Sequence, residues 1–346
     1  MTDDKKEDRT EIADIGEIGL IDRIREKFKP SRESTIFGIG DDAAVFEKTD
    51  NLSLLSTDML VEGVHFDLSY MPLQHLGYKS VSANVSDIAA MNGIPKAITV
   101  NIALSNRFSV EAVEEIYQGI KFACEDYKID LAGGDTTASP SGLILSISII
   151  GEVAKNKVVY RNTAEEKDIL CVTGDLGGAY LGLQILEREK QVFSANPEMQ
   201  PELDKYEYLV KRQLKPLARM DIIHDLDELK IIPTSMIDIS DGLVSEIFHI
   251  CKESDLGVVI FEDKLPIDQE TNNAAAEFNL DPTTCALNGG EDYELLFTIG
   301  QNEFEKIKNH PEISFIGYMD KKANGKNLVT KSQNTVALHA QGWNHF

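Results

Sequence analysis

Several apolar segments of this chain end in, or lead to, a turn that carries Gly and Asp, and this recurring junction restricts the folds the sequence can adopt. The segments LLSTD, AGGDTT, IDISDG and NGGEDYEL are of this kind. Strand ends are where a sheet holds polar side chains for a ligand, because the strand fixes the backbone while the loop is left to carry function. The pattern therefore predicts strands that converge on one polar site.

Apolar periodicity predicts strands and helices that alternate loosely along the chain. We expect strands over 52–60, 95–105, 142–153, 169–174, 234–239, 257–262, 293–299 and 312–318. We expect helices over 18–28, 74–92, 109–127, 178–188, 204–213, 217–229, 241–254 and 302–309. The alternating apolar residues of VEGVHF are expected to add a further strand, and 188–204 to form an exposed loop. Loose alternation favours an α+β or mixed α/β fold over a doubly wound parallel sheet.

Length and a change of composition predict two domains. The chain has 346 residues, which is more than one small core requires. The polar segment 154–168 separates two apolar halves. We expect a disordered tail over 1–15, an N-terminal domain over 16–155 and a C-terminal domain over 166–346.

The acidic balance limits the possible partners. Fifty-eight acidic and 34 basic residues give a formal charge of -24, which repels nucleic acid and anionic membranes. No apolar run approaches the roughly 20 residues of a membrane-spanning helix. The first residues lack the apolar core of a signal peptide, and the four cysteines form no CxxC pair. We therefore expect neither nucleic acid nor membrane as a partner, and a cytoplasmic protein.

The aspartates allow two interpretations each. An Asp after a strand often forms a turn or caps a helix, and we favour this for Asp175. For Asp241 the cap and a metal-binding role are equally supported. Asp41 and Asp42 repel each other, which an ordinary turn rarely requires, so this pair favours a bound cation. Asp87 lies in a predicted helix, where Asp is a poor helix former, and belongs either to a solvated face or to the same polar site.

The residue types favour magnesium and phosphate chemistry. Carboxylates and hydroxyls are hard oxygen ligands, and no His or Cys accompanies them at ligand spacing, so Mg²⁺, or Mn²⁺ in its place, suits them better than zinc or iron. In phosphoryl transfer such ions neutralise phosphate charge, and catalysis is mostly positioning and electrostatics. The chain has no GxxxxGK[ST] loop and no HRD or DFG motif. The segment GIGDDA precedes a predicted strand, which argues against a Rossmann dinucleotide site.

Taken together, the motifs resemble one family. GIGDDAAVF, LLSTDMLVEGVHF, GYKSVSANVSDIAAMNGIP, LAGGDTT, VVYRNTA, TGDLGG, IDISDGL and NGGEDYEL are similar, in order, to the motifs of thiamine-monophosphate kinases. The resemblance implies a two-domain aminoimidazole ribonucleotide synthetase-like (PurM-like) fold, with an N-terminal α/β and a C-terminal α+β domain. It also implies a homodimer, ATP as co-substrate, several Mg²⁺ ions, and direct phosphorylation of thiamine monophosphate.

The resemblance also implies roles for individual residues. The implied Mg²⁺ ligands are Asp42, Ser56, Thr57, Asp58, Asp87, Asp135, Asp238 and Asp241. The implied ATP-contacting residues are Tyr117, Gly134, Asp135, Arg161 and Ser240, and the guanidinium of Arg161 can bind phosphate oxygens in pairs. The implied residues for thiamine monophosphate are His65, Glu291 and Trp343, since a carboxylate and an aromatic face suit a cationic ring. The alternatives are an ordinary strand histidine for His65 and core packing for Trp343.

Two other functions compete with this hypothesis. A selenophosphate synthetase would have similar Asp turns but needs a reactive Cys or selenocysteine near its N-terminus, whereas the first cysteine here is Cys124, within a predicted helix. A non-catalytic nucleotide- or cation-binding protein would retain the fold. The complete set of metal and ATP motifs argues against this second alternative.

Overall fold

The structure is a computed structural model that describes residues 23–24, 26–29, 31, 35–37, 45–46 and 51–339. The chain divides into two compact units. The first contains the chain up to Val85 and Ile94–Glu152, and the second contains Ser86–Gly93 and the chain from Val153 onward. The domain bounds expected from the sequence stay a prediction.

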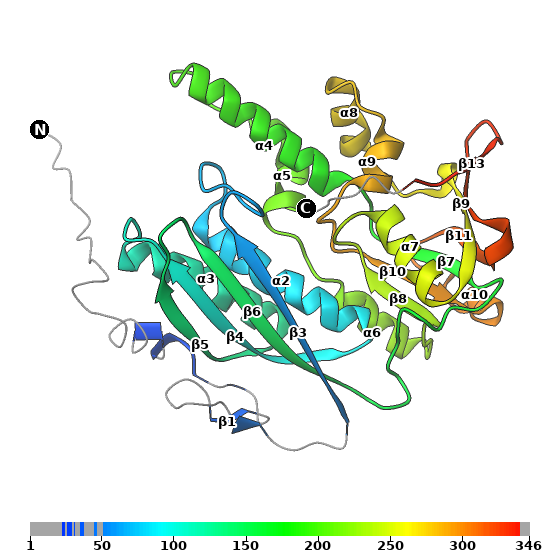
Figure 1. The fold of residues 1–346 in the computed structure, drawn as a ribbon, viewed down its shortest axis with the longest axis horizontal. Helices are drawn as coiled ribbons and strands as arrows, with labels where there is room; N and C mark the ends of the chain where they lie inside the picture. Colours follow the sequence, from blue (N-terminus) through cyan, green and yellow to red (C-terminus); the bar gives the residue numbers. More distant parts are fainter. Residues whose placement is uncertain are drawn as a thin grey trace, which may run out of the picture. The chain divides into compact units, whose positions relative to one another are not determined.

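A four-stranded sheet forms the centre of the first unit. Its strands are β3 (Leu52–Val61), β4 (Ile94–Leu104), β5 (Asp130–Ala138) and β6 (Ile144–Val153), and their order is β3-β6-β4-β5. Strands β4 and β5 are parallel and are connected through helix α3 (Val110–Tyr127), whereas β4 and β6 are antiparallel. Helices α2 (Leu73–Ala90) and α3 lie on one face of this sheet (Figure 1). A short two-stranded ladder pairs β1 (Thr35–Phe37) with β2 (Val45–Phe46).

The sequence of β6 shows why one face of this sheet is covered. Successive side chains of a strand point to opposite faces, so ILSISII divides into two sets. Leu145, Ile147 and Ile149 are buried, whereas Ser146 and Ser148 are only partly buried. The apolar set therefore forms the core beneath the helices, and the polar set lies on the opposite face.

Two glycines let helices α2 and α3 cross at backbone distance. A Cβ added at Gly77 would lie 2.0 Å from the carbonyl oxygen of Ile116, and one added at Gly119 would lie 1.8 Å from that of Gln74. Neither distance is possible for a real side chain. The crossing therefore requires glycine on both helices.

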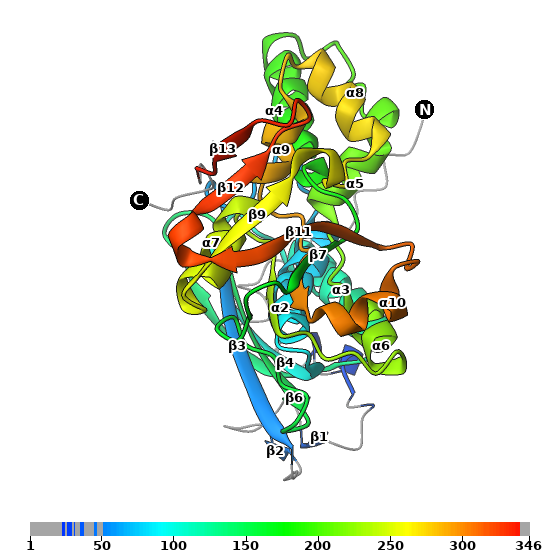
Figure 2. The same ribbon diagram turned by 90° about the vertical axis from the view of Figure 1, so that its right-hand side faces the viewer.

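A seven-stranded sheet forms the second unit, with the order β13-β12-β9-β11-β7-β10-β8. Its pairs are antiparallel apart from β9 and β12, which are parallel. Figure 2 shows β9, β11 and β12 side by side. The strands are β7 (Ile169–Thr173), β8 (Ser235–Asp238), β9 (Leu256–Phe261), β10 (Leu295–Ile299), β11 (Ile313–Lys321), β12 (Lys326–Val329) and β13 (Thr335–Ala337).

Helices of the second unit pack on this sheet and on one another. Buried residues of β7, β8 and α7, including Val172, Ile237 and Ile247, form one core, and Leu181, Leu209 and Ala275 contribute to a second core between helices. The helices are α4 (Gly178–Ala195), α5 (Glu207–Leu214), α6 (Met220–Glu228), α7 (Leu243–Glu253), α8 (Gln269–Glu277), α9 (Pro282–Asn288) and α10 (Phe304–Ile307). Single 3₁₀ turns cover Asp204–Tyr206, Glu262–Lys264, Gln301–Glu303 and Lys322–Asn324.

Two local predictions were wrong. The segment expected as an exposed loop over 188–204 begins inside α4, which continues to Ala195; within it Glu189 is buried and accepts a hydrogen bond of 3.1 Å from the backbone N–H of Glu202. Within VEGVHF, Val61 ends β3 and residues 63–65 form a turn instead of a further strand, because Gly63 has φ +80° and the imidazole of His65 accepts a hydrogen bond from the backbone N–H of Val61.

Two helices, α8 and α9, and four strands, β1, β5, β12 and β13, were not expected from the sequence. Helix α8 has a largely polar sequence and buries only small residues such as Ala274 and Ala275, so its apolar periodicity is weak. Strand β5 contains two adjacent glycines, and β12 and β13 are short. Of the helix expected over 18–28, the described residues 23–24 and 26–27 are helical, and most of the others lie outside the described residues.

Within residues 51–339, no helix has both the length and the apolar character needed to cross a bilayer.

Candidate active site

The carboxyl end of β8 carries a buried carboxylate of the second unit. Asp238 is the last residue of this strand, and its side chain is only 4% exposed. It accepts a hydrogen bond of 2.7 Å from the hydroxyl of Ser86, at the end of α2 that belongs to this unit. Asp87, half-buried, follows directly in the chain. The end of α2 therefore brings the motif VSDIAAMNG to the motif IDISDG.

Negative charge accumulates at this strand end. Glu246 of α7 is buried and accepts a hydrogen bond of 3.1 Å from the backbone N–H of Asp241. Burial raises the pKa of Glu246 to about 8, and the nearby charges of Asp238 and Asp241 add to this effect, whereas the bond from Asp241 and the charge of Arg161 oppose it. Crowded carboxylates of this kind favour a cation beside them.

The loop NGGEDYEL is hydrogen-bonded to the same segment. The backbone N–H of Glu291 donates to the carbonyl of Ser240 at 2.7 Å, and that of Tyr293 donates to Ile239 at 2.9 Å. A Cβ at Gly290 would lie 2.6 Å from the Ser240 oxygen, so this approach requires glycine. The second unit therefore brings four predicted residues into adjoining segments, namely Asp238, Ser240, Asp241 and Glu291.

The helix-cap alternative is wrong for both aspartates, whereas a turn role for Asp175 and a metal-binding role for Asp241 stay predictions. The N-cap positions of α4 and α7 are Gly177 and Gly242, so neither Asp175 nor Asp241 caps its helix. Instead the carboxylate of Asp292 accepts hydrogen bonds from the backbone N–H groups of Gly177, at 2.8 Å, and Ala179, at 3.2 Å. A carboxylate at a helix N-terminus satisfies unpaired N–H groups and interacts favourably with the helix dipole.

A buried ion-pair network lies behind this loop, and sequence reasoning missed it. The guanidinium of Arg212 binds the carboxylate of Glu294 at 2.8 Å and lies 3.5 Å from that of Asp292. Arg219 binds the other oxygen of Glu294 at 2.6 Å. In the sequence, this network was indicated only by Arg212 and Arg219, which lie seven residues apart, and by the acidic segment EDYEL further along the chain.

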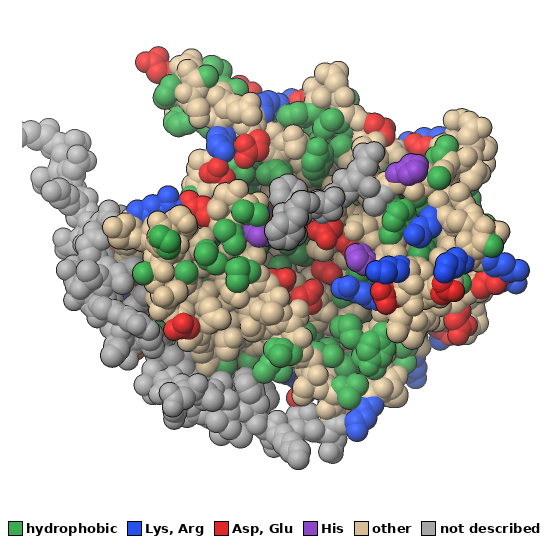
Figure 3. Space-filling view, in the orientation of Figure 1, with side chains coloured by type: hydrophobic (Ala, Val, Ile, Leu, Met, Phe, Trp, Pro, Cys, Tyr) green, Lys and Arg blue, Asp and Glu red, His purple; other side chains and the backbone are tan. Residues whose placement is uncertain are grey.

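Arg161, a predicted ATP contact, lies at the surface of the second unit. Its side chain is exposed, and its backbone carbonyl accepts hydrogen bonds from the hydroxyls of Ser235, at 3.0 Å, and Ser254, at 3.1 Å. These bonds fix the backbone of Arg161, while its guanidinium remains exposed. Figure 3 shows Lys and Arg side chains beside Asp and Glu side chains over the second unit.

In the first unit, five of the predicted residues lie on the two outer strands of the sheet, namely Ser56, Thr57 and Asp58 on β3 and Gly134 and Asp135 on β5. Thr57 of β3 donates to the carbonyl of Ile147 at 2.9 Å and accepts from Ser148 at 3.0 Å. Asp135 of β5 is exposed and pairs in register with Asn101, which pairs with Ser146 of β6, so it shares the face of Ser148. Alternation along β3 places Ser56 and Asp58 toward the other face.

The remaining predicted residues of the first unit are well fixed. Tyr117 of α3 is buried, packs edge-on against Phe28 with ring centroids 6.2 Å apart, and has its pKa raised by burial. A Cβ at Gly134 would lie 1.8 Å from the carbonyl of Val100, so close strand contact requires glycine there. The bond from Val61 to Nδ1 of His65 leaves the ring proton of the neutral imidazole on Nε2. Asp42 and Trp343 lie outside the described residues.

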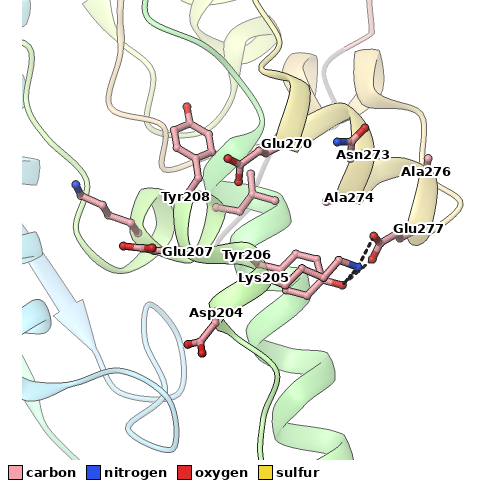
Figure 4. A pocket seen from close by; sticks show the side chains of 12 residues that line it. Asp204, Lys205, Tyr206, Glu207, Tyr208, Glu270, Asn273, Ala274, Ala276 and Glu277 are labelled. Carbon is pink, nitrogen blue, oxygen red and sulfur yellow. Dashed lines mark hydrogen bonds and ion pairs between the residues drawn. The ribbon is translucent and has the colours of Figure 1, made fainter.

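A polar groove of about 780 Å³ between α5 and α8 is separate from these residues. Figure 4 shows Lys205 and Tyr206 pointing to Glu277, which they contact at 2.7 and 2.6 Å. None of the predicted site residues lines it. This groove is therefore not the candidate active site.

The donor set fits a hard divalent cation. Among residues 51–339 and the shorter described segments, no three or more His, Cys, Asp and Glu side chains are grouped so as to hold a metal unaided. Mg²⁺ does not need such a group, because it binds through one or two carboxylates together with phosphate oxygens and water. The oxygen ligands of Asp238 and Asp241, beside the crowded Glu246, suit this mode.

Comparison with known proteins places the chain in a family. Residues 40–153 match the family described as AIR synthase related protein, N-terminal domain. The thiamine-monophosphate kinase of Aquifex aeolicus is 34% identical over 336 residues, covering 97% of this chain and 99% of the relative. That of Bacillus subtilis is 32% identical over 315 residues, covering 89% and 93%.

Solved structures agree in fold. A structure described as AaThiL complexed with AMPPCP and TMP has a TM-score of 0.74 at 33% identity and covers 96% of this chain and 98% of its own. The thiamine-monophosphate kinase of Stenotrophomonas maltophilia has a TM-score of 0.77 at 29% identity, covering 92% and 98%. The expected mixed α/β, PurM-like fold is confirmed, with a four-stranded sheet in the first unit and a seven-stranded sheet in the second. By sequence and by fold, this chain belongs to the thiamine-monophosphate kinase family.

Proposed function

We propose that this thiamine-monophosphate kinase transfers the γ-phosphoryl group of ATP directly, in line, to the phosphate of thiamine monophosphate. The product pair is thiamine diphosphate and ADP. The observation that carries the proposal is the hydrogen-bonded junction of the IDISDG and NGGEDYEL segments, where Glu291 is bonded to Ser240. The solved relative with AMPPCP and TMP, an ATP analogue and the second ligand, supports binding of both substrates here.

The chain's residues have positioning and electrostatic roles in this reaction. A phosphate oxygen of thiamine monophosphate attacks the γ-phosphorus while the bond to the β-phosphate oxygen of ATP breaks. The attacking oxygen is already ionised at neutral pH, so no strong general base is needed. We assign contacts with ATP to Tyr117, Gly134, Asp135, Arg161 and Ser240, and contacts with the thiamine part to His65, Glu291 and Trp343.

Magnesium binding is part of the proposal. We assign Mg²⁺ ligands to Asp42, Ser56, Thr57, Asp58, Asp87, Asp135, Asp238 and Asp241. When bound, Mg²⁺ supplies charge neutralisation between two phosphate chains that would otherwise repel each other. The excess of carboxylates around Glu246 supports this assignment.

We also propose a homodimer and a cytoplasmic location. Strand β3 is an outer strand of the first sheet, and its Leu55 and Met59 are 75% and 55% exposed. Exposed apolar side chains on an outer strand favour pairing with another chain. All four cysteines are unbridged and buried, which supports a reducing compartment.

The experiment compares Asp238→Asn with a matched control. Purified protein is assayed for ADP and thiamine diphosphate with ATP, thiamine monophosphate and a series of Mg²⁺ concentrations. Asp238→Asn is expected to lower turnover by at least about 100-fold at limiting Mg²⁺, because a carboxylate ligand is lost. The control is Asp255→Asn, at an exposed position. Asp255 has a positive φ, which Asn also adopts readily, so this variant should have the turnover of the wild type.

The result separates the competing functions. ADP formation that requires thiamine monophosphate supports the kinase. ADP formation that does not depend on it, or the absence of ATP turnover at saturating Mg²⁺, would contradict the proposal. If Asp238→Asn has the turnover of the wild type at limiting Mg²⁺, the carboxyl end of β8 does not bind the metal.

A further inference from the structure

Helix α5 presents two neighbouring residues to the NGGEDYEL loop. Arg212 binds the buried acidic network, and the side-chain amide of Gln213 donates a hydrogen bond of 2.6 Å to Oε2 of Glu291. Gln213 is only 3% exposed. A buried amide that donates to a carboxylate makes a stronger bond than one between neutral groups, and its loss is costly.

The position of Gln213 is fixed by the packing of two helices. A Cβ at Gly182 of α4 would lie 2.1 Å from the carbonyl of Leu209 and 3.0 Å from Cβ of Gln213. The two helices therefore touch at backbone distance at the turn that carries Gln213. Helix α4 is in turn anchored at its first turn by Asp292, the residue after Glu291.

The backbone of the loop is held in a strained conformation. Glu291 and Tyr293 have φ values of +64° and +52°, which are uncommon for residues with side chains. Such conformations persist only where the surroundings fix them, and they occur often at ligand sites. Here the backbone bond to Ser240 holds one end of Glu291 and the amide of Gln213 holds its carboxylate. Both the backbone and the side chain of Glu291 are thereby oriented.

We propose that Gln213 is a positioning residue that orients the Glu291 carboxylate toward the cationic heterocycle of the substrate, and thereby contributes to the selection of that substrate. The inference rests on the proposed role of Glu291 as a substrate contact. Gln213 acts through Glu291 and does not itself touch the reacting phosphates. Its removal therefore affects recognition of thiamine monophosphate and leaves ATP recognition intact.

The test replaces Gln213 by Met, which keeps the length and burial of the side chain and removes the amide. We expect KM for thiamine monophosphate to rise about tenfold, the effect of one lost hydrogen bond to a charged group, with less than about a twofold change in KM for ATP and in kcat. The matched control is Lys211→Met, at an exposed position of the same helix. A second variant, Gln213→Asn, keeps an amide but is one methylene too short to reach Glu291, and should behave like Gln213→Met.

Glu291→Gln, alone and combined with Gln213→Met, separates the possible failures. If Glu291→Gln leaves KM for thiamine monophosphate unchanged, the proposed role of Glu291 is wrong. If Glu291→Gln raises this KM while both Gln213 variants leave it unchanged, the positioning role is wrong. If the positioning role is correct, the double variant has the KM of Glu291→Gln alone. If the Gln213 variants raise KM for ATP as much as KM for thiamine monophosphate, and also lower the urea midpoint of unfolding, Gln213 is a purely structural residue and the proposal is overturned.

Discussion

Replacing Gly178 at the start of α4 tests how the buried charges behind the candidate site are satisfied. A Cβ at this position would lie 3.4 Å from Cγ of Arg212 and 3.6 Å from both Nε of Arg212 and Oδ1 of Asp175, so Ala fits without overlap. These two polar atoms are buried and have no hydrogen-bond partner among the described residues. A donor and an acceptor that face the same small space are suited to hold one water molecule between them.

Two effects of opposite sign then compete. Gly→Ala in a helix stabilises the folded state by up to about 1 kcal/mol, because the unfolded chain loses freedom. Displacing a water from a buried donor and a buried acceptor costs about 1–3 kcal/mol for each group. The second effect is larger, so Gly178→Ala is expected to lower the free energy of unfolding by about 2 kcal/mol.

Urea denaturation followed by circular dichroism measures this change, and Gly178→Ser is the matched control. A serine hydroxyl at the same position can take the place of the water between Arg212 and Asp175. Gly178→Ser is therefore expected to be more stable than Gly178→Ala by at least about 1 kcal/mol. An Ala variant that is more stable than both the wild type and the Ser variant would refute the reasoning, because a dry space would gain from the added methyl group.

Two further predictions concern the site. Ser86→Ala removes the hydrogen bond to Asp238 and is expected to raise the Mg²⁺ concentration for half-maximal binding by about tenfold. Calorimetry with an ATP analogue measures this concentration. If it is unchanged, Ser86 does not orient the carboxylate of Asp238. Burial raises the pKa of Asp292 from 3.8 to about 6, so the folded protein holds this proton more tightly than the unfolded chain, and stability falls as pH rises. From pH 5 to 7.5 the wild type should lose about 1.4 kcal/mol relative to Asp292→Asn in urea denaturation, and equal pH dependence would exclude this cause.

The sequence predicted those parts of the structure that depend on local patterns. The strand end at Asp238 and the apolar alternation of β6 follow from residues close together in the chain. The family assignment likewise followed from short motifs in order, and the comparisons confirm it. Local patterns were sufficient for the strands, and resemblance to known motifs was sufficient for the family.

Contacts between distant segments were not accessible in this way. Asp175 and Asp241 had suitable sequence positions for helix caps, yet glycines occupy both N-cap positions. The carboxylate that does satisfy the first turn of α4 belongs to Asp292, which only the pairing of β10 with β7 and β8 brings near. The bond from Gln213 to Glu291 also depends on tertiary packing, because no local pattern links α5 to the loop.

The cap on α4 has a consequence for synthesis of the chain. Asp292 lies 115 residues after Gly177, whose N–H it accepts. At a translation rate of about 5–20 residues per second, the first turn of α4 is made roughly 6–23 s before its cap. Until β10 has emerged and paired, this helix end has exposed N–H groups and frays. Amide hydrogen exchange on ribosome-bound chains that stop before residue 292 should therefore show rapid exchange at Gly177 and Ala179. Longer chains, in which β10 has emerged and docked, should show protection at both amides.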